Sequence, residues 1–373
     1  MGPLWFALPG FVIWVGILFL PWRPWSTRES LEAKTSMDND LSRVTVLIPA
    51  RNEGSTIART LLSVAGQGNG HRIILIDDQS TDNTSIEARR LELDNLKIIE
   101  GRALPAGWTG KLWALQQGLA HVRTAYILLL DADIELIPGT LSALLAKLEQ
   151  DNLQMISLMA FLRMESFWEK LLMPAFIYFF KFLYPFHLAN AGSRHIAAAA
   201  GGCILVRSET LNAIGGFEVL RNALIDDCTL ARHVKNQGGK IWLGLTHSAR
   251  SHRQYHGLKI IWEMVARTAF TQLRYSLNLL AACTLLLGAT YLLPVVSLFS
   301  GDKTALFLAA TSLAIMWGTY IPTLTYYNLS VFWAVLLPVI ALLYLAMTWT
   351  SAIRYWKGTS AIWKERSYEK PGN

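Results

Sequence analysis

The chain of 373 residues is 52% hydrophobic and only 16% charged, which excludes an ordinary soluble enzyme and predicts a membrane region. The formal net charge of +7 is not gathered into a basic block, so no nucleic-acid partner is expected and contact with anionic lipid headgroups is favoured. The three cysteines, Cys203, Cys228 and Cys283, form no CxxC pair and indicate neither a disulfide framework nor a zinc site.

The N-terminal segment 3–20 is uncharged and long enough to span a bilayer. It lacks the basic n-region and the cleavage site of a signal peptide, so we expect a retained anchor over residues 1–25. Basic residues follow this segment and none precedes it, and the positive-inside rule therefore predicts that the next domain faces the cytoplasm. Residues 26–42 are polar and are expected to form a linker.

From residue 43 to about residue 250, short apolar runs alternate with helical patterns. The expected strands are 44–49, 72–77, 96–100 and 125–131, and the expected helices are 54–66, 82–93, 110–122 and 138–149. This alternation predicts a parallel sheet with right-handed crossovers, in which ligands bind beyond the carboxyl ends of the strands. Polar clusters occur at those ends, namely Arg51-Asn52-Glu53, Asp77-Asp78 and Asp131-Ala132-Asp133.

Asp131 and Asp133 leave an apolar strand one residue apart and can turn together into a cleft. Carboxylates suit Mg²⁺ or Mn²⁺, and Mg²⁺ typically binds one or two carboxylates plus substrate phosphates. An isolated DxD sequence is commonly a solvated turn, but its place after a buried strand favours a metal site. Asp78 is interpreted as a ligand-binding residue, whereas Asp82 and Thr84 fit helix capping.

Three further candidates lie later in the chain. Lys111 follows a glycine-flanked turn at a helix start, where it can approach phosphate, although the spacing is not that of a P-loop. Gly201 and Gly202 permit close approach of the backbone to a ligand, or simply a tight turn. Asp226 and Asp227 open a helix, where they could stabilise the helix dipole or supply a general base.

The remaining segments concern the membrane. Residues 167–190 are rich in aromatics and predict a helix in the membrane interface, with a buried core helix as the alternative. The stretches 279–299, 304–322 and 331–350 are each long enough to span, within a C-terminal region 276–373 that ends in a basic tail. If the preceding domain is cytoplasmic, three spans would place the basic tail on the opposite side of the membrane, against the positive-inside rule. We therefore expect one stretch to be re-entrant or interfacial.

In chain order, VLIPARNE, IDDQSTDNT, the GK turn, DAD, GGCILVR and the DD helix resemble the family 2 glycosyltransferases over residues 43–275. The flanking apolar segments and GWTGKLWALQQG are similar to the bacterial hopene-associated glycosyltransferases. The resemblance implies an α/β domain with the GT-A fold, a Rossmann-like nucleotide-sugar-binding architecture. It also implies an N-terminal transmembrane anchor and a C-terminal helical membrane region.

The resemblance also implies a role for each matching residue. The donor would be bound by Pro49, Arg51, Glu53, Asp78, Lys111 and Asp131. Asp131 and Asp133 would hold the metal, and Asp227 falls where the family carries its general base, with Asp226 in place of the family's glutamate. The acceptor or diphosphate region would include Gly201, Gly202, Asp226 and Arg274.

The predicted function is that of an inverting hexosyltransferase that uses a nucleotide-sugar, expected to be a UDP-sugar, with Mg²⁺ or Mn²⁺. The expected acceptor is a membrane lipid, a hopanoid or another isoprenoid lipid. The protein is expected to be a multi-pass protein of the inner (cytoplasmic) membrane, with its catalytic domain facing the cytoplasm.

One alternative is a processive polysaccharide synthase. Its QxxRW motif is absent, because residues 272–275 (QLRY) have one residue between Gln272 and Arg274 where the motif has two. The other is an inactive membrane scaffold, against which the intact Asp131, Asp133 and Asp227 argue.

Overall fold

The structure, a computed structural model, describes residues 4–33, 40–358, 361–363 and 366–368, and it divides into two compact units. The helical unit comprises residues 1–28, 164–187 and 255–361, and the sheet unit comprises residues 29–163, 188–254 and 362–373. These boundaries differ from the expected domain 43–275, because segments 164–187 and 255–275 belong to the helical unit. Part of the expected linker belongs to the sheet unit, where Ser30 pairs with Leu245.

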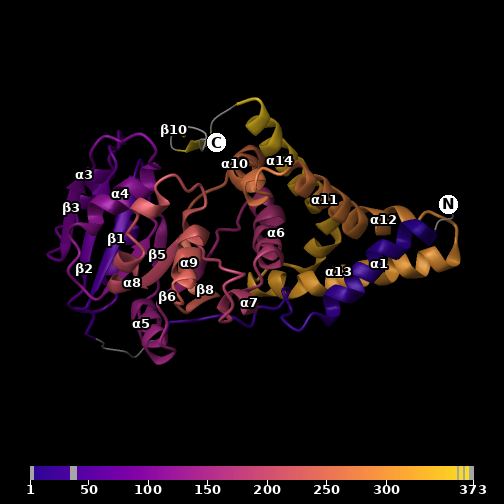
Figure 1. The fold of residues 1–373 in the computed structure, drawn as a ribbon, viewed down its shortest axis with the longest axis horizontal. Coiled ribbons are helices and arrows are strands. Elements are labelled where there is room, and N and C mark those ends of the chain that lie inside the picture. Colours follow the sequence, from indigo (N-terminus) through magenta and orange to yellow (C-terminus); the bar gives the residue numbers. More distant parts are fainter. Residues whose placement is uncertain (1–3, 34–39, 359–360, 364–365, 369–373) are drawn as a thin grey trace. The chain divides into compact units, whose positions relative to one another are not determined.

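The described part of the sheet unit contains an eight-stranded sheet with the order β3-β2-β1-β4-β7-β6-β8-β5 (Figure 1). The strands are β1 (Val44–Ala50), β2 (Arg72–Asp77), β3 (Leu96–Glu100), β4 (Tyr126–Leu130), β5 (Ile134–Leu136), β6 (Met155–Phe161), β7 (Cys203–Arg207) and β8 (Ile241–Ser251). Strands β3, β2, β1 and β4 are mutually parallel, which confirms the predicted half of the sheet. Strand β7 runs antiparallel to both β4 and β6, and the sequence pattern did not predict this.

Helices cover both faces of the sheet because side chains along each strand alternate between the two faces. One face packs on α2 (Ile57–Ala65), α3 (Thr84–Arg89) and α5 (Thr140–Gln150) through side chains such as Val46 and Ile48. The other face packs on α4 (Gly110–Leu119), α8 (Ser208–Ala213) and α9 (Asp226–Asn236) through side chains such as Leu47 and Leu129. The helices predicted between residues 54 and 149 are confirmed, with ends shifted by up to four residues.

The helical unit contains helices from both ends of the chain. They are α1 (Leu4–Phe19), α6 (Phe167–Leu183), α10 (Leu258–Gln272), α11 (Leu277–Leu287), α12 (Leu293–Ser297), α13 (Lys303–Tyr326) and α14 (Leu337–Trp356). Among the described residues, three helical stretches are long and apolar enough to cross a membrane, namely Leu277–Ser297, Lys303–Tyr326 and Val331–Trp356. They coincide with the three predicted stretches. Length and composition allow all three to cross, so a re-entrant stretch stays a prediction.

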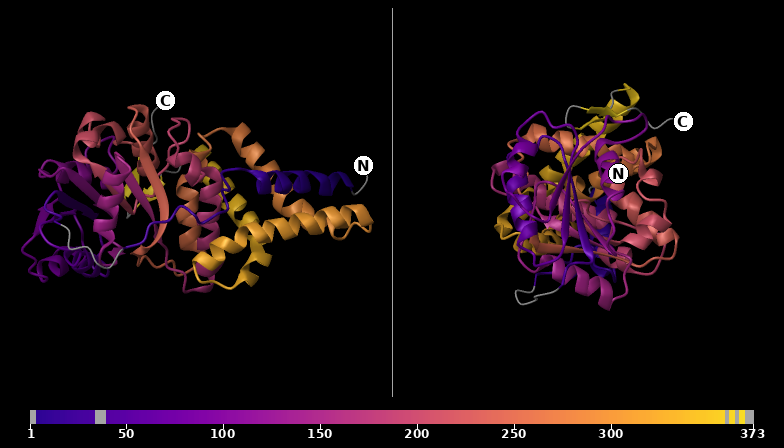
Figure 2. Two further views of the ribbon diagram at one scale, coloured as in Figure 1. Left: turned by 90° about the horizontal axis from the view of Figure 1, so that it is seen from below. Right: turned by 90° about the vertical axis from the view of Figure 1, so that its left-hand side faces the viewer.

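Helix α1 packs closely against the C-terminal helices of its own unit. The indole of Trp14 donates a hydrogen bond to the carbonyl oxygen of Thr290 at 2.8 Å, and α1 lies beside α13 (Figure 2, left). A Cβ atom on Gly10 would lie 2.7 Å from the carbonyl oxygen of Ala289, so only glycine permits this approach. With 16 residues, α1 is an apolar helix near the lower limit of a span, and its role as a membrane anchor stays a prediction.

Helix α6 begins at a capping box in which Ser166 and Glu169 satisfy each other's backbone N–H groups. Its Tyr178 hydroxyl is 2.9 Å from the Thr319 hydroxyl of α13, and the Tyr344 hydroxyl of α14 donates to the carbonyl oxygen of Leu172 at 2.8 Å. One face of α6 is therefore buried against α13 and α14, as the alternative of a buried helix expects. Its placement at a membrane interface stays a prediction.

Candidate active site

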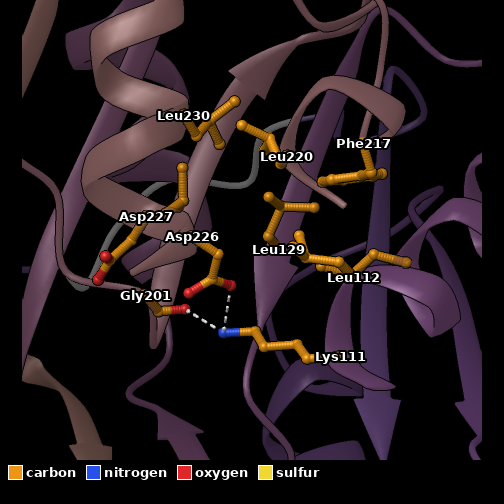
Figure 3. Close-up of a pocket in the computed structure, with 11 residues that line it drawn as sticks. Lys111, Leu112, Leu129, Gly201, Phe217, Leu220, Asp226, Asp227 and Leu230 are labelled. Carbon is orange, nitrogen blue, oxygen red and sulfur yellow. Dashed lines mark hydrogen bonds and ion pairs between the residues drawn. The ribbon is translucent and has the colours of Figure 1, made fainter. Parts of the chain in front are cut away.

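Lys111, in the first turn of α4, joins three residues that are far apart in the sequence. Its Nζ atom lies 2.8 Å from Asp131 Oδ1. It also lies 3.6 Å from Asp226 Oδ2 and donates to the carbonyl oxygen of Gly201 at 3.4 Å (Figure 3). Burial alone would lower the pKa of Lys111, but the two carboxylates raise it above its ordinary value. Lys111 is therefore a charged group at the meeting point of β4, α9 and the segment before β7.

Asp227 lies next to Asp226 in the first turn of α9. Its Oδ1 accepts a hydrogen bond from the backbone N–H of Cys228 at 2.7 Å, and neither acid occupies the N-cap position, which belongs to Ile225. Burial and the neighbouring Asp226 carboxylate raise the pKa of Asp227 to about 7. A carboxyl group with that pKa is suited to accept a proton near neutral pH, so the geometry is compatible with the general-base interpretation.

An apolar pocket adjoins these charged groups. Lys111, Gly201, Asp226 and Asp227 line part of it (Figure 3). Its walls are Leu112, Leu115, Leu129, Ile204, Phe217, Leu220 and Leu230. Burial of the Asp227 carboxyl group disfavours its charged form. No local sequence pattern signals this pocket, because its residues come from five separate segments.

Asp133 forms an ion pair with Arg253, a residue that the sequence did not indicate as part of the site. Arg253 Nη2 lies 3.1 Å from Asp133 Oδ1 and 3.0 Å from Glu53 Oε1, and the Ser251 hydroxyl donates to Asp133 Oδ2 at 2.6 Å. Burial would raise the pKa of Asp133, but Arg253 and Ser251 hold it below its ordinary value. Asp133 is therefore ionised, and Arg253 links the end of β4 to the loop after β1.

The two carboxylates after β4 fit a divalent cation. Burial raises the pKa of Asp131, Lys111 opposes this, and the nearby Asp133 charge adds to it. A cation between the two acids would relieve that repulsion. In the described ranges, no group of three or more His, Cys, Asp or Glu residues is arranged to hold a metal. The chain would therefore supply Asp131 and Asp133, and a bound diphosphate or water would complete the coordination, as Mg²⁺ commonly requires.

The loops after β1 and β2 are joined by hydrogen bonds. Arg51 Nη1 donates to the carbonyl oxygens of Asp78 at 2.7 Å and of Gln79 at 3.1 Å, and the backbone N–H of Glu53 donates to the Thr84 hydroxyl at 2.8 Å. Asp78 itself is buried, with 2% of its surface exposed.

The structure thus places the predicted donor-binding residues along one edge of the sheet unit, with Pro49 inside β1 at its carboxyl end. Gly202 lies beside them, because its carbonyl oxygen accepts a hydrogen bond from the Asp131 N–H at 3.0 Å. Arg274 is the exception. It is exposed after the end of α10 in the helical unit, so the sheet unit alone does not bring it to the diphosphate region.

Residues 45–215 match the sequence model of "Glycosyl transferase family 2". The chain is 36% identical to the 4,4'-diaponeurosporenoate glycosyltransferase of Staphylococcus aureus over 107 residues, 29% of this chain and 28% of that one. It is 33% identical over 119 residues, 30% of this chain and 35% of the other, to the undecaprenyl-phosphate 4-deoxy-4-formamido-L-arabinose transferase of Shewanella sediminis. The matches span about a third of the length of these relatives.

Among solved structures, the mannosyltransferase of Pyrobaculum calidifontis in complex with GDP-Man and Mn²⁺ superposes with a TM-score of 0.55. The superposition covers 94% of this chain and 95% of that one at 17% sequence identity, so it shows a shared fold. Residues 45–215 therefore match the family 2 glycosyltransferases, and the sheet unit that contains most of these residues has the GT-A fold.

Proposed function

We propose that the chain transfers a sugar from a nucleotide-sugar to a membrane lipid, with inversion at the anomeric carbon. The observation that carries this proposal is the position of Asp227, a carboxyl group with a pKa of about 7, beside the Lys111–Asp131 ion pair. A proton acceptor and a group suited to bind diphosphate therefore share one site. Transfer to a hydroxyl acceptor needs both, because a proton leaves the acceptor while negative charge develops on the leaving diphosphate.

On the donor side, Pro49, Arg51, Glu53 and Asp78 are proposed to bind the nucleotide, which we take to be a UDP-sugar. Asp131 and Asp133 would hold Mg²⁺ or Mn²⁺, which when bound neutralises charge on the departing diphosphate. Lys111, kept charged by its carboxylate neighbours, is placed to contact the diphosphate from the side of α4. The residues orient the donor and lower the cost of charge separation, while the leaving group departs with the electron pair of the bond to the sugar.

On the acceptor side, Asp227 is proposed to take the proton of the acceptor hydroxyl. The oxygen then forms a bond to the anomeric carbon from the face opposite the diphosphate, whose bond to that carbon breaks, and this gives inversion. Gly201 keeps the space beside this carboxylate open, because a Cβ atom there would lie 3.2 Å from Asp227 Oδ2. The Asp226 carboxylate raises the pKa of Asp227 and so keeps it basic enough to act.

A lipid acceptor is supported by two features. The helical unit has three helices that are long and apolar enough to cross a membrane. The names of the two relatives contain the lipids diaponeurosporenoate and undecaprenyl phosphate. Within this class we propose a hopanoid or another isoprenoid lipid. A screen of nucleotide-sugars against lipid extracts, with the product mass measured, tests the acceptor and the donor together.

Gly201→Ala is expected to lower the turnover number by about tenfold, because misplacing reacting groups by about 1 Å can cost about 100-fold in rate. The added methyl group would lie 3.2 Å from Asp227 Oδ2 and 3.3 Å from Lys111 Nζ, so one of these side chains must move. Gly202→Ala is the matched control, since its Cβ would make ordinary contact with Ile134 at 3.4 Å. Steady-state kinetics of both variants check this, and equal losses would contradict the assignment of Gly201.

The sheet unit is proposed to face the cytoplasm at the inner membrane. The support is the set of basic residues that follows the first apolar segment. A cysteine at the exposed position of Arg90, in a Cys283→Ala background, should resist an impermeant thiol reagent in intact cells and react after permeabilisation. The native Cys203 and Cys228 are buried and should contribute little signal. Efficient labelling of intact cells would reverse the proposed orientation.

A further inference from the structure

Lys235 is a lysine in the last turn of α9 whose side chain is almost entirely buried, with 2% of its surface exposed. Its Nζ atom donates hydrogen bonds to three backbone carbonyl oxygens, those of Ala191 at 2.9 Å, Ser193 at 2.8 Å and Ile196 at 2.7 Å. An ammonium group has three N–H donors and no acceptor, so this arrangement uses all of them. A lysine on a solvent-exposed helix face would direct its ammonium group to water and not to three backbone carbonyl oxygens.

The three carbonyl groups belong to the connection 191–202 between α7 (Phe186–Asn190) and β7, and we call its residues 191–201 the β7 lead-in segment. The far end of this segment is also fixed. The Ser157 hydroxyl donates to the carbonyl oxygen of Ala200 at 3.0 Å and accepts from its N–H at 2.8 Å. The next residue is Gly201, whose carbonyl oxygen accepts a hydrogen bond from Lys111.

Both ends of the β7 lead-in segment contact the same helix. Lys235 holds its beginning at the last turn of α9, and Cys228 Sγ approaches the carbonyl oxygen of Ala199 at 3.6 Å at the first turn. Asp227 packs against Gly201 at that same first turn. Helix α9 has 11 residues and a continuous hydrogen-bonded backbone, so it fixes the spacing between the two points. The path of the segment that leads to Gly201 is therefore set by contacts at both ends of α9.

We propose that Lys235 is a positioning residue for the transfer reaction, in which its charge gathers the carbonyl groups of Ala191, Ser193 and Ile196 and thereby sets Gly201 against Asp227 and Lys111. The inference rests on the proposed function for its kinetic consequence. Its structural consequence is independent of activity. Without the ammonium group, three carbonyl oxygens converge on an empty point with their partial negative charges unsatisfied, and the segment must open toward water.

Lys235→Ala is expected to lower the turnover number by about 10–100-fold while the KM for the donor changes less than about twofold, because misplacement acts on the reacting geometry. Hydrogen–deuterium exchange over residues 191–201 should become faster in the same variant. The cavity left by the side chain matches n-propylammonium, so this cation should restore both turnover and protection. Propan-1-ol, which has a similar size but no charge, should restore neither.

Two further variants keep the test decisive. Lys235→Met fills the cavity without donors, and it should lose turnover without rescue by n-propylammonium. Arg232→Ala changes an exposed residue on the same helix and should behave as the wild type. Wild-type turnover and protection in both Lys235 variants would overturn the proposal, as would equal losses of donor affinity and turnover without rescue. A wild-type protein without transferase activity would contradict the proposed function, while the exchange measurement would still decide whether Lys235 holds the segment.

Discussion

Asp227→Asn is expected to lower the turnover number for sugar transfer by about 10²–10⁴-fold, the usual contribution of general-base assistance. The amide cannot take the proton of the acceptor hydroxyl. Its oxygen can still accept the hydrogen bond that the Cys228 N–H gives to Asp227, and the lost interaction of a charge with the helix dipole costs only about 0.3–1 kcal/mol. The melting temperature and donor affinity should therefore change little. Steady-state kinetics and thermal melting of the purified variant check this.

Asp226→Asn is the matched control. It leaves the carboxyl group of Asp227 in place and removes the 3.6 Å contact between Asp226 and Lys111, so it should cost less turnover. Near-native turnover in Asp227→Asn would contradict the base assignment. Loss of activity in both variants through unfolding would contradict it as well.

The pH profile provides a second readout of the same group. The base form of Asp227 is the deprotonated one and its pKa is raised to about 7, so kcat/KM should rise with pH through about 7 and then level off. Asp226→Asn removes one of the two causes of that raised pKa, so the inflection should move to lower pH. In Asp227→Asn this inflection should disappear. An unchanged inflection in Asp227→Asn would assign the titration to another group.

Asp133→Ala is expected to abolish the dependence of donor binding on Mn²⁺. Asp133 is buried and ionised, and Asp131 alone would offer a single carboxylate that Lys111 already neutralises. Changes in residues that only support metal ligands typically cost about 10–100-fold in metal affinity, so loss of a ligand should cost at least that much. Titration of UDP with and without Mn²⁺ measures the effect.

Two other substitutions separate metal binding from folding. Asp133→Asn keeps the shape and the hydrogen-bonding oxygen, and it should lose most of the Mn²⁺ effect without losing stability. Ser251→Ala removes one hydrogen bond to Asp133 and should weaken the Mn²⁺ effect by about 10–100-fold without abolishing it. A Mn²⁺-dependent affinity that is unchanged in Asp133→Ala would reject the role of this residue.

The sequence predicted the parallel half of the sheet because its strands are continuous apolar runs separated by helices of ordinary length. Strands β4 and β1 illustrate this, since nearly every residue in them is buried. The antiparallel half could not be predicted in the same way. Strand β7 lies between β4 and β6 although both precede it in the chain, and the local pattern of CILVR does not indicate its neighbours.

The site was predicted where acids directly follow strands and was missed where contacts join distant segments. Arg253 pairs with Asp133 across 120 residues and with Glu53 across 200 residues, and no local spacing signals those contacts. Lys235 looks like a solvated helical lysine because its carbonyl partners lie about 40 residues away in an irregular segment. A basic residue directly after β8 was the available signal for Arg253, since the ends of neighbouring strands border the same edge of a sheet.

The most direct test of the account is the mass of the product formed by the purified full-length protein in detergent, given nucleotide-sugars, Mn²⁺ and lipid extract. We expect a lipid heavier by one sugar residue, formed only with the metal and formed at least about 100-fold more slowly with Asp227→Asn. A polymeric product, or no transfer from any donor by a folded protein, would contradict the account.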